Sequence, residues 1–158
     1  MEFNDYLQIK NLLYRYAELV DQGDFAAVGL LFAHADFYGP GVGPFKSDPG
    51  AVAENYRRWV RIYPDSGTPK TRHVTSNLII ESDGLERAKA RSNVLVFQGT
   101  AEFRLQPVIA SSYRDRFQRV DGVWRFSERR IGLEVPDIIG DLSAHLTQTD
   151  HLTAAPRK

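Results

Sequence analysis

The spacing of apolar residues divides the chain into a helical first part and a β-rich second part. Residues 4–20 repeat apolar side chains every three or four positions, which predicts an amphipathic helix. Gly23 can take the left-handed conformation that ends such a helix, and Asp24 can cap a second, shorter helix over 25–33. Residues 50–63 predict a third helix, which ends where prolines and glycine follow.

Glycines, prolines and alternating apolar residues predict the order of the remaining elements. The segment YGPGVGPFKSDPG, residues 38–50, holds too many glycines and prolines for regular structure and is predicted to be a loop. Strands are predicted over 71–82, 87–99, 106–120 and 123–135. The Asp-Gly pair at 121–122 is a strong hairpin signal. Helices followed by consecutive antiparallel strands predict an α+β fold, in which a strongly curved antiparallel sheet closes over the N-terminal helices.

Length and composition are typical of one globular domain. The chain has 158 residues; we assign 1–135 to the domain and 136–158 to an extension that lies at a subunit interface or is partly disordered. Acidic and basic residues balance at 20 each, which gives no reason to expect a nucleic-acid or membrane partner. The chain lacks cysteine, and its first residues, MEFND, do not form a signal peptide, so we expect a cytoplasmic protein.

The strand over 71–82 carries aliphatic residues on both faces. Strict alternation puts on one face His73, Thr75, Asn77 and Ile79. It puts on the other Val74, Ser76, Leu78 and Ile80. A sheet with one face in water would not need this, so the second face is expected to be covered by another subunit or by a coil of the same chain.

The last strand has two sets of apolar residues with opposite parity. Trp124 and Phe126 are even-numbered, whereas Ile131, Leu133 and Val135 are odd. One inserted residue within 127–130, a β-bulge, would bring both sets to one face and turn Arg129 inward. The alternative is an unbroken strand whose outer face is itself an interface.

The stretch TRHVTSN, 71–77, places a histidine at the start of an otherwise apolar strand. The chain has only 4 histidines, and they show no metal-ligand spacing; no nucleotide-binding glycine motif is present either. We therefore predict no metal and no cofactor. From the residues alone, His73 is either a general base or a satisfied core residue, and Asp21 either orients it or merely ends the first helix.

Three segments together resemble the nuclear transport factor 2-like (cystatin-like, SnoaL-like) cone fold: YRYAELVDQGDFAAVGLLF, RHVTSN and YRDRFQRVDGVWRF. Among its members, scytalone dehydratase and hexachlorocyclohexane dehydrochlorinase use a histidine-aspartate pair, at positions that match His73 and Asp21. The resemblance implies that His73 is the base and that Asp21 orients it. A ring nitrogen of His73 should then lie ~2.6–3.2 Å from an Asp21 carboxylate oxygen.

The resemblance also implies substrate-binding roles around this pair. Arg129 stands where the dehydrochlorinase has an arginine, Gln98 where scytalone dehydratase has a second histidine, and Ser111 where it has a serine. The complete set of expected substrate-binding residues is Tyr16, Trp59, Asn77, Gln98, Ser111, Tyr113 and Arg129. Together they predict a cofactor-independent lyase of the dehydratase type, acting on a small, mostly apolar or aromatic molecule. Relatives with the dyad are trimers, so a homo-oligomer is expected, with a trimer favoured over a dimer.

Two alternatives stay open. RYAELVDQGD also resembles the first helix of ketosteroid isomerase, with Tyr16 at its oxyanion tyrosine, but the position of its catalytic aspartate is Gly39 here. Proton transfer of that kind, or of the polyketide-cyclase kind, is the second hypothesis. The third is a non-catalytic small-ligand-binding module or small subunit, which predicts a cone filled by side chains and no contact between His73 and Asp21.

Overall fold

The computed structural model describes residues 1–40, 42–132 and 137–147. Its helices are α1 (Phe3–Gln22), α2 (Phe25–Leu31) and α3 (Pro49–Trp59). Its strands are β1 (Asp36–Gly39), β2 (Val42–Lys46), β3 (Thr71–Ser82), β4 (Arg87–Gln98), β5 (Gln106–Val120), β6 (Val123–Ile131) and β7 (Ile138–Ile139). None of the helices in the described ranges is long and apolar enough to cross a membrane.

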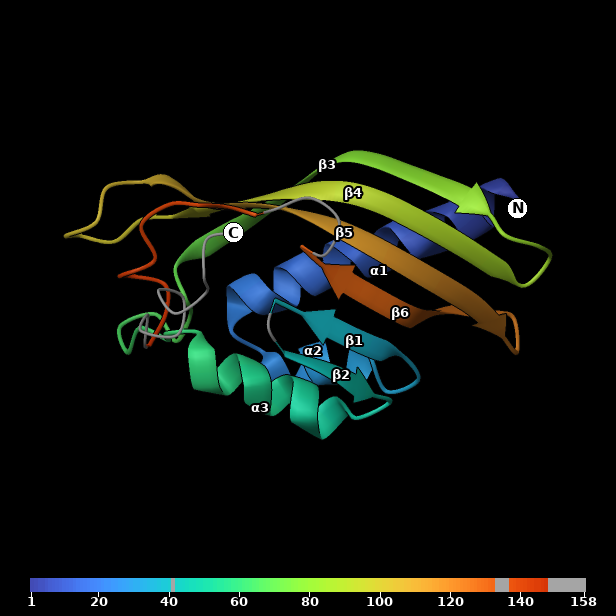
Figure 1. Ribbon diagram of the computed structural model, residues 1–158, viewed down its shortest axis with the longest axis horizontal. Helices are drawn as coiled ribbons and strands as arrows, with labels where there is room; N and C mark the ends of the chain where they lie inside the picture. Colours follow the sequence, from blue (N-terminus) through green and yellow to red (C-terminus); the bar gives the residue numbers. More distant parts are fainter. Residues whose placement is uncertain (41, 133–136, 148–158) are drawn as a thin grey trace, which may run out of the picture.

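One curved sheet forms most of the molecule, in the order β2-β1-β6-β5-β4-β3, with β7 added to β5. The long strands β3 to β6 arc over α1, while α2 and α3 lie on the side of β1 and β2 (Figure 1). This is the predicted α+β cone. The expectation of a wholly antiparallel sheet is wrong in one place, because β1 runs parallel to β6.

The predicted junction between the first and second helices is confirmed. Gly23 follows α1 with φ 75°, and its amide donates to the carbonyls of Leu19 and Val20. Asp24 then caps α2 by accepting a hydrogen bond from the amide of Ala27 at 3.0 Å. This short connection holds the C-terminal turn of α1, and with it Asp21, in one orientation.

The expected loop over 38–50 is wrong: most of it forms the β1–β2 hairpin. Phe37 is 1% exposed, and its ring stacks on Phe45 at 6.4 Å, so aromatic burial outweighs the breakers in this segment. Pro44 is tolerated because β2 is an edge strand, where the missing amide leaves no partner unsatisfied. The third helix also stops earlier than predicted, at Trp59, because Val60 is extended and forms a bridge with Leu146.

The bulge predicted in the last strand is confirmed. Phe117 of β5 pairs with Phe126 and Arg116 with Glu128, so Ser127 is the inserted residue. Trp124, Phe126 and Arg129 are consequently all buried. The strand ends at Ile131, and the predicted inward residues Leu133 and Val135 lie outside the described residues.

A second bulge, in β3, was not predicted. Ser76 pairs with Asn93 and Ile79 with Arg91, and Asn77 takes a positive φ of 51°. Beyond the bulge, Leu78 and Ile80 pack against the core, while Asn77 and Ile79 are exposed. Placing Asn77 and Ile79 on the face of His73 was therefore wrong, because burying Leu78 and Ile80 requires the change of parity.

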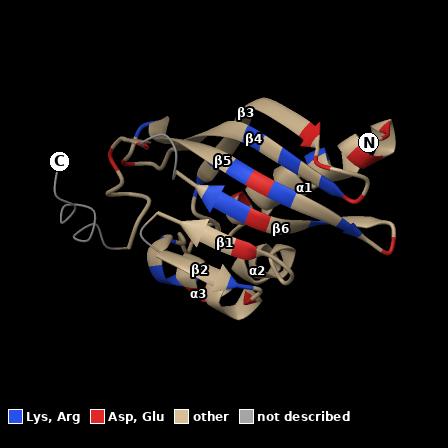
Figure 2. Ribbon diagram, turned by 45° about the vertical axis from the view of Figure 1, so that its right-hand side comes forward, with Lys and Arg blue, Asp and Glu red and all other residues tan. Residues whose placement is uncertain are grey.

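The outer face of the sheet has a charged half and an apolar half. Arg91, Arg114 and Arg130 are register neighbours across β4, β5 and β6. Figure 2 shows basic residues recurring side by side on these strands with acidic residues between them. Toward the other end, the outer row consists of Val74, Leu95, Ala110 and Ile138. Val74 is 45% and Ile138 74% exposed within one chain, so this row is where the expected subunit contact would lie.

Candidate active site

His73 and Asp21 are in direct contact. The Nδ1 atom of His73 lies 2.6 Å from Oδ1 of Asp21, as the resemblance predicted. The His73 amide donates to Oδ2 at 2.9 Å, and the Thr71 hydroxyl donates to Oδ1 at 2.7 Å. The first residues of β3 thus surround the carboxylate that ends α1, and Asp21 is fixed by the same strand that carries its partner.

These contacts determine the charge and the tautomer of the pair. Burial alone would raise the pKa of Asp21, but the hydrogen bonds and charge of His73, together with the Thr71 hydroxyl, hold that pKa below its usual value. An ionised carboxylate beside Nδ1 keeps a proton on that nitrogen. Nε2 of His73 is then left to accept a proton, which is the arrangement of a general base.

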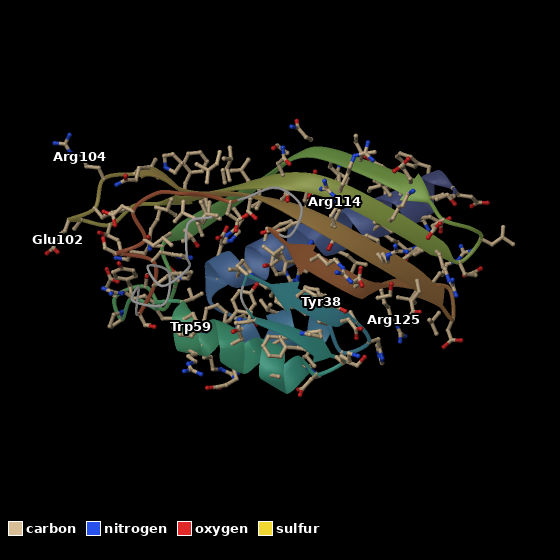
Figure 3. All side chains as sticks on the ribbon, in the orientation of Figure 1. Tyr38, Trp59, Glu102, Arg104, Arg114 and Arg125 are labelled. Carbon is tan, nitrogen blue, oxygen red and sulfur yellow. The ribbon has the colours of Figure 1, made fainter. Side chains whose placement is uncertain are left out.

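A cavity of about 480 Å³ opens beside the pair, within the size range of small-ligand sites. Of the predicted residues, it is lined by Tyr16, Trp59, His73, Ser111 and Tyr113. Most of its remaining wall is aliphatic, including Val20, Val94, Val96 and Ile109. Trp59 lies at the end of α3 (Figure 3), where its carbonyl accepts a hydrogen bond from the amide of Thr147 at 2.9 Å.

Three tyrosines meet on one wall of this cavity. The hydroxyls of Tyr16 and Tyr56 are 2.5 Å apart, and the rings of Tyr16 and Tyr113 meet edge to face at 5.9 Å. Burial, followed by the proximity of Tyr16, raises the pKa of both Tyr56 and Tyr113 well above the ordinary value, so these phenols stay protonated. Tyr56 was missed in the sequence, although it lies one helical turn before Trp59 and on the same side of α3.

Arg129 lies behind the tyrosines and is not on the cavity wall. Its side chain is fully buried and forms a bidentate pair with Asp115, at 2.7 and 2.9 Å. The guanidinium carbon lies 4.1 Å from the Tyr16 ring centre and 4.4 Å from that of Tyr113. The expected direct contact with substrate is therefore corrected: the bulge turns Arg129 inward, but the aromatic rings cover it.

Burial would lower the pKa of Arg129, but the charge and hydrogen bonds of Asp115 raise it, so the guanidinium stays charged. This fixed positive charge stands under the rings of Tyr16 and Tyr113.

Gln98 and Asn77 do not line the cavity, so placing them among the substrate-binding residues was wrong. Gln98 is fully buried, and its Nε2 donates to the carbonyls of Pro69 at 2.9 Å and Ala144 at 3.0 Å. It anchors a chain segment and does not face the cavity. Asn77 is exposed at the β3 bulge, beyond the end of the cavity lining.

The C-terminal segment supplies cavity residues that sequence reasoning missed. From residues 137–147 the lining takes Asp137, Ile139, Leu142, His145 and Leu146. The segment is attached to the cone through β7 and the bridge between Val60 and Leu146. Its weakly apolar pattern suggested only an extension; a histidine within it was the one available signal. Within the described ranges, no group of three or more acidic or histidine side chains is arranged to hold a metal ion.

Comparisons with known proteins agree with this architecture. A model of the SnoaL-like domain family matches residues 1–130. The search of curated proteins found no match. Among solved structures, a variant of Rv3472 from Mycobacterium tuberculosis, a protein of unknown function, is 27% identical over 82% of this chain and 76% of its own, with a TM-score of 0.65.

Two further structures come from Novosphingobium aromaticivorans. An NTF2-like protein with a cystatin-like fold is 23% identical, covers 84% of each chain and has a TM-score of 0.65. A protein provisionally named a scytalone dehydratase is 22% identical over 89% of this chain and 91% of its own, with a TM-score of 0.64. At these identities, both similarities show the cone fold alone.

Proposed function

This chain belongs to the SnoaL-like domain family, and on that basis we propose that it is a cofactor-independent lyase of the dehydratase type, with His73 as general base. The observation that carries the proposal is the 2.6 Å contact of Asp21 with His73, which lies on the wall of a mostly apolar cavity. A small, mostly apolar molecule, aromatic or polyketide-like, suits that cavity. The provisional name of the structural neighbour makes dehydration the first reaction to examine.

In the proposed reaction, Nε2 of His73 removes a proton from a carbon next to an electron-withdrawing group. The C–O bond on the neighbouring carbon then breaks as the double bond forms, and the leaving hydroxyl takes the proton from the His73 imidazolium and departs as water. Asp21 keeps the ring in position and stabilises the imidazolium that forms. General-base catalysis of this kind contributes ~10²–10⁴-fold to the rate.

Tyr16 and Tyr56 supply hydrogen bonds where negative charge develops on the substrate. Their hydroxyls already contact each other, so a substrate oxygen at this point would meet a positioned phenolic donor. The buried guanidinium of Arg129, under the Tyr16 ring, adds a fixed positive potential without contacting the substrate. Arg129 is thus a positioning residue in this proposal.

Isomerase-like or cyclase-like proton transfer is the second candidate, because it can use the same base and the same phenols. Gly39 lies on the cavity wall with no side chain to act as the base of ketosteroid isomerase, so His73 would have to take that role. The binding-module hypothesis predicted a filled cone and separate His73 and Asp21 side chains. The cavity of about 480 Å³ and the contact between the two residues count against it.

The test is a screen of aromatic and alicyclic β-hydroxy ketones, in which elimination is followed by the ultraviolet absorbance of the new double bond. Mass spectrometry distinguishes loss of water from isomerisation at constant mass. His73→Asn and Asp21→Asn should each reduce the rate by ~10²–10⁴-fold. His34→Gln is the matched control, since His34 is exposed and outside the cavity lining.

Product of unchanged mass would favour the isomerase reading. Turnover that survives in both dyad variants would refute His73 as the base. Saturable binding with no turnover of any compound would favour a binding module.

A further inference from the structure

His145 is held by its backbone while its imidazole faces the cavity. Its amide donates to the carbonyl of Leu142 at 2.9 Å, and its carbonyl accepts from the amide of Arg61 at 2.9 Å. The preceding carbonyl, of Ala144, accepts from Gln98 and from the Tyr63 hydroxyl. The position of His145 is therefore well defined on both sides.

The imidazole itself has no partner in the part of the chain that the structure describes. The residue is 6% exposed, it lines the same cavity as His73, and its Nδ1 is buried without a hydrogen bond. Burial, and after it the charge of His73, lowers its pKa to about 4, with Asp21 opposing the shift. At neutral pH, His145 is thus an uncharged group that can both donate and accept a hydrogen bond.

Two more buried polar atoms on the cavity wall are in the same situation. Within the described ranges, Oγ of Ser111 and Oδ1 of Asp137 have no hydrogen-bond partner, and both residues line the cavity. Ile139 pairs with Ile109 and Ile138 with Ala110, and Asp137 and Ser111 are the next residues along the two segments.

The position of Asp137 depends on a glycine. A Cβ on Gly132 would lie 2.6 Å from both carboxylate oxygens of Asp137, so a larger residue there would displace the carboxylate from this place. Gly132 has φ 65°, a conformation that also favours glycine. The carboxylate thus lies close against the backbone of Gly132, and its Oδ1 is buried.

Buried polar atoms without partners are unfavourable and uncommon, so the presence of three of them in the lining of a single cavity is informative. They are satisfied together if the ligand brings hydroxyl groups, since a hydroxyl donates to a carboxylate and exchanges hydrogen bonds with a neutral imidazole. An entirely apolar ligand would leave all of them unpaired.

We propose that His145 and Asp137, both on the C-terminal segment, bind hydroxyl groups of the substrate, so that the substrate is an apolar ring or chain carrying hydroxyls. The assignment deepens the proposed function and rests on it for the location of the substrate. His145 and Asp137 take no proton from carbon; they select the ligand and fix its orientation relative to His73.

The experiment measures binding, so it does not depend on turnover. Calorimetry compares 2-naphthol with naphthalene, a pair that differs by one hydroxyl, on the wild-type chain and on His145→Leu, His145→Gln and Asp137→Leu. The wild type should prefer 2-naphthol by about tenfold or more, the effect of one good hydrogen bond in a buried site. His145→Leu or Asp137→Leu should reduce that preference severalfold, and His145→Gln should retain part of it.

Two controls separate recognition from general damage. His34→Leu removes an exposed histidine and should leave the preference unchanged. His73→Asn should slow elimination by ~10²–10⁴-fold but keep the preference for 2-naphthol, so failure of the proposed reaction and failure of this inference give different results. A preference that is absent in the wild type, including no binding of 2-naphthol, or unchanged in folded His145→Leu and Asp137→Leu, overturns the proposal.

A spectroscopic measurement covers the case in which the leucine variants do not fold. In wild-type chain with ¹⁵N-labelled histidine rings, the His145 signals are assigned by elimination, using single glutamine variants of the other histidines. Saturation with 2-naphthol should shift the His145 ring nitrogens, and naphthalene should shift them much less. Equal shifts with both compounds, or none, would refute a hydrogen bond from His145.

Discussion

Two carboxylate pairs lie inside this cone, and they differ in access to the cavity. Asp21 and His73 have side chains that are 11% and 8% exposed, and His73 lies on the cavity wall with Asp21 directly behind it. Asp115 and Arg129 are both 0% exposed and are sealed behind the rings of Tyr16 and Tyr113. The first pair joins a carboxylate to a group that can gain and lose a proton; the second joins it to one that cannot.

The two pairs are therefore suited to different roles: one can take part in proton transfer, and the other stabilises the structure around it. A histidine at the cavity can exchange protons with a ligand, whereas a buried guanidinium keeps its charge and holds its surroundings in place. Removing a member of either pair should therefore be costly, but in different measurements. The predictions below begin with the largest expected effect.

The largest difference between the two pairs is expected in kcat. Asp21→Asn removes the charge that stabilises the imidazolium and should lower kcat for elimination by ~10²–10⁴-fold. Replacing the sealed pair together, with Arg129→Met and Asp115→Leu, should lower kcat less, because neither residue contacts the substrate. Steady-state kinetics on a substrate from the screen checks this. A double variant as inactive as Asp21→Asn would show that the sealed pair is also needed for the chemistry.

For the free energy of unfolding, the larger effect is expected at the pair of Asp115 and Arg129. Arg129→Met leaves the Asp115 carboxylate buried without a partner and should lower the free energy of unfolding by ~3–5 kcal/mol. Asp21→Asn keeps the side-chain volume beside a cavity and should cost only ~1–2 kcal/mol. Urea unfolding measures both. Adding Asp115→Leu to Arg129→Met should recover most of the loss; if it does not, the cost comes from lost packing and not from an unpaired charge.

The cavity side should also respond to pH, through His145. The pKa of His145 is about 4 in the folded chain, against ~6.5 for an unfolded histidine, so between these values the unfolded state binds more protons. Stability should consequently fall as pH drops from ~6.5 to ~4, by at most ~3 kcal/mol. The lowered pKa of Asp21 acts only below this window, where its protonation removes further stability.

Thermal unfolding of the wild type and of His145→Gln between pH 4 and pH 7 checks this assignment. The variant should show the flatter profile over that range. Parallel profiles would mean that another group causes the pH dependence.

A substitution on the outer face of the sheet is expected to have the smallest effect on either pair. Val74→Glu places a charge in the exposed apolar row, so it should weaken the expected oligomer without moving His73 or Asp115. Light scattering at micromolar concentration measures the assembly. A wild-type chain that is already monomeric would remove the argument for this interface, and a large stability loss in a monomeric variant would show that the pairs depend on assembly.

Much of the architecture could be predicted because each local signal had a single structural solution. Asp24 caps a helix directly after the glycine that ends α1. The opposite parities of Trp124 and Ile131 predicted an irregularity in the last strand, with an unbroken strand as the alternative, and the structure has the bulge, at Ser127. The same reasoning missed the bulge in β3, because aliphatic residues on both faces made either parity acceptable.

The order of helices and strands could be derived from the chain's residue pattern, which also favoured the β6 bulge over an unbroken strand. The resemblance to the cone fold added the approach of His73 to Asp21. The composition of the cavity wall, which excludes Gln98 and Arg129 and includes His145 and Asp137, depends on how the elements pack together. The physical reason is that periodicity reports which face of an element is buried, but not what lies opposite that face. The curvature of the sheet and the path of the C-terminal segment decide whether a buried polar side chain meets a protein partner or a cavity.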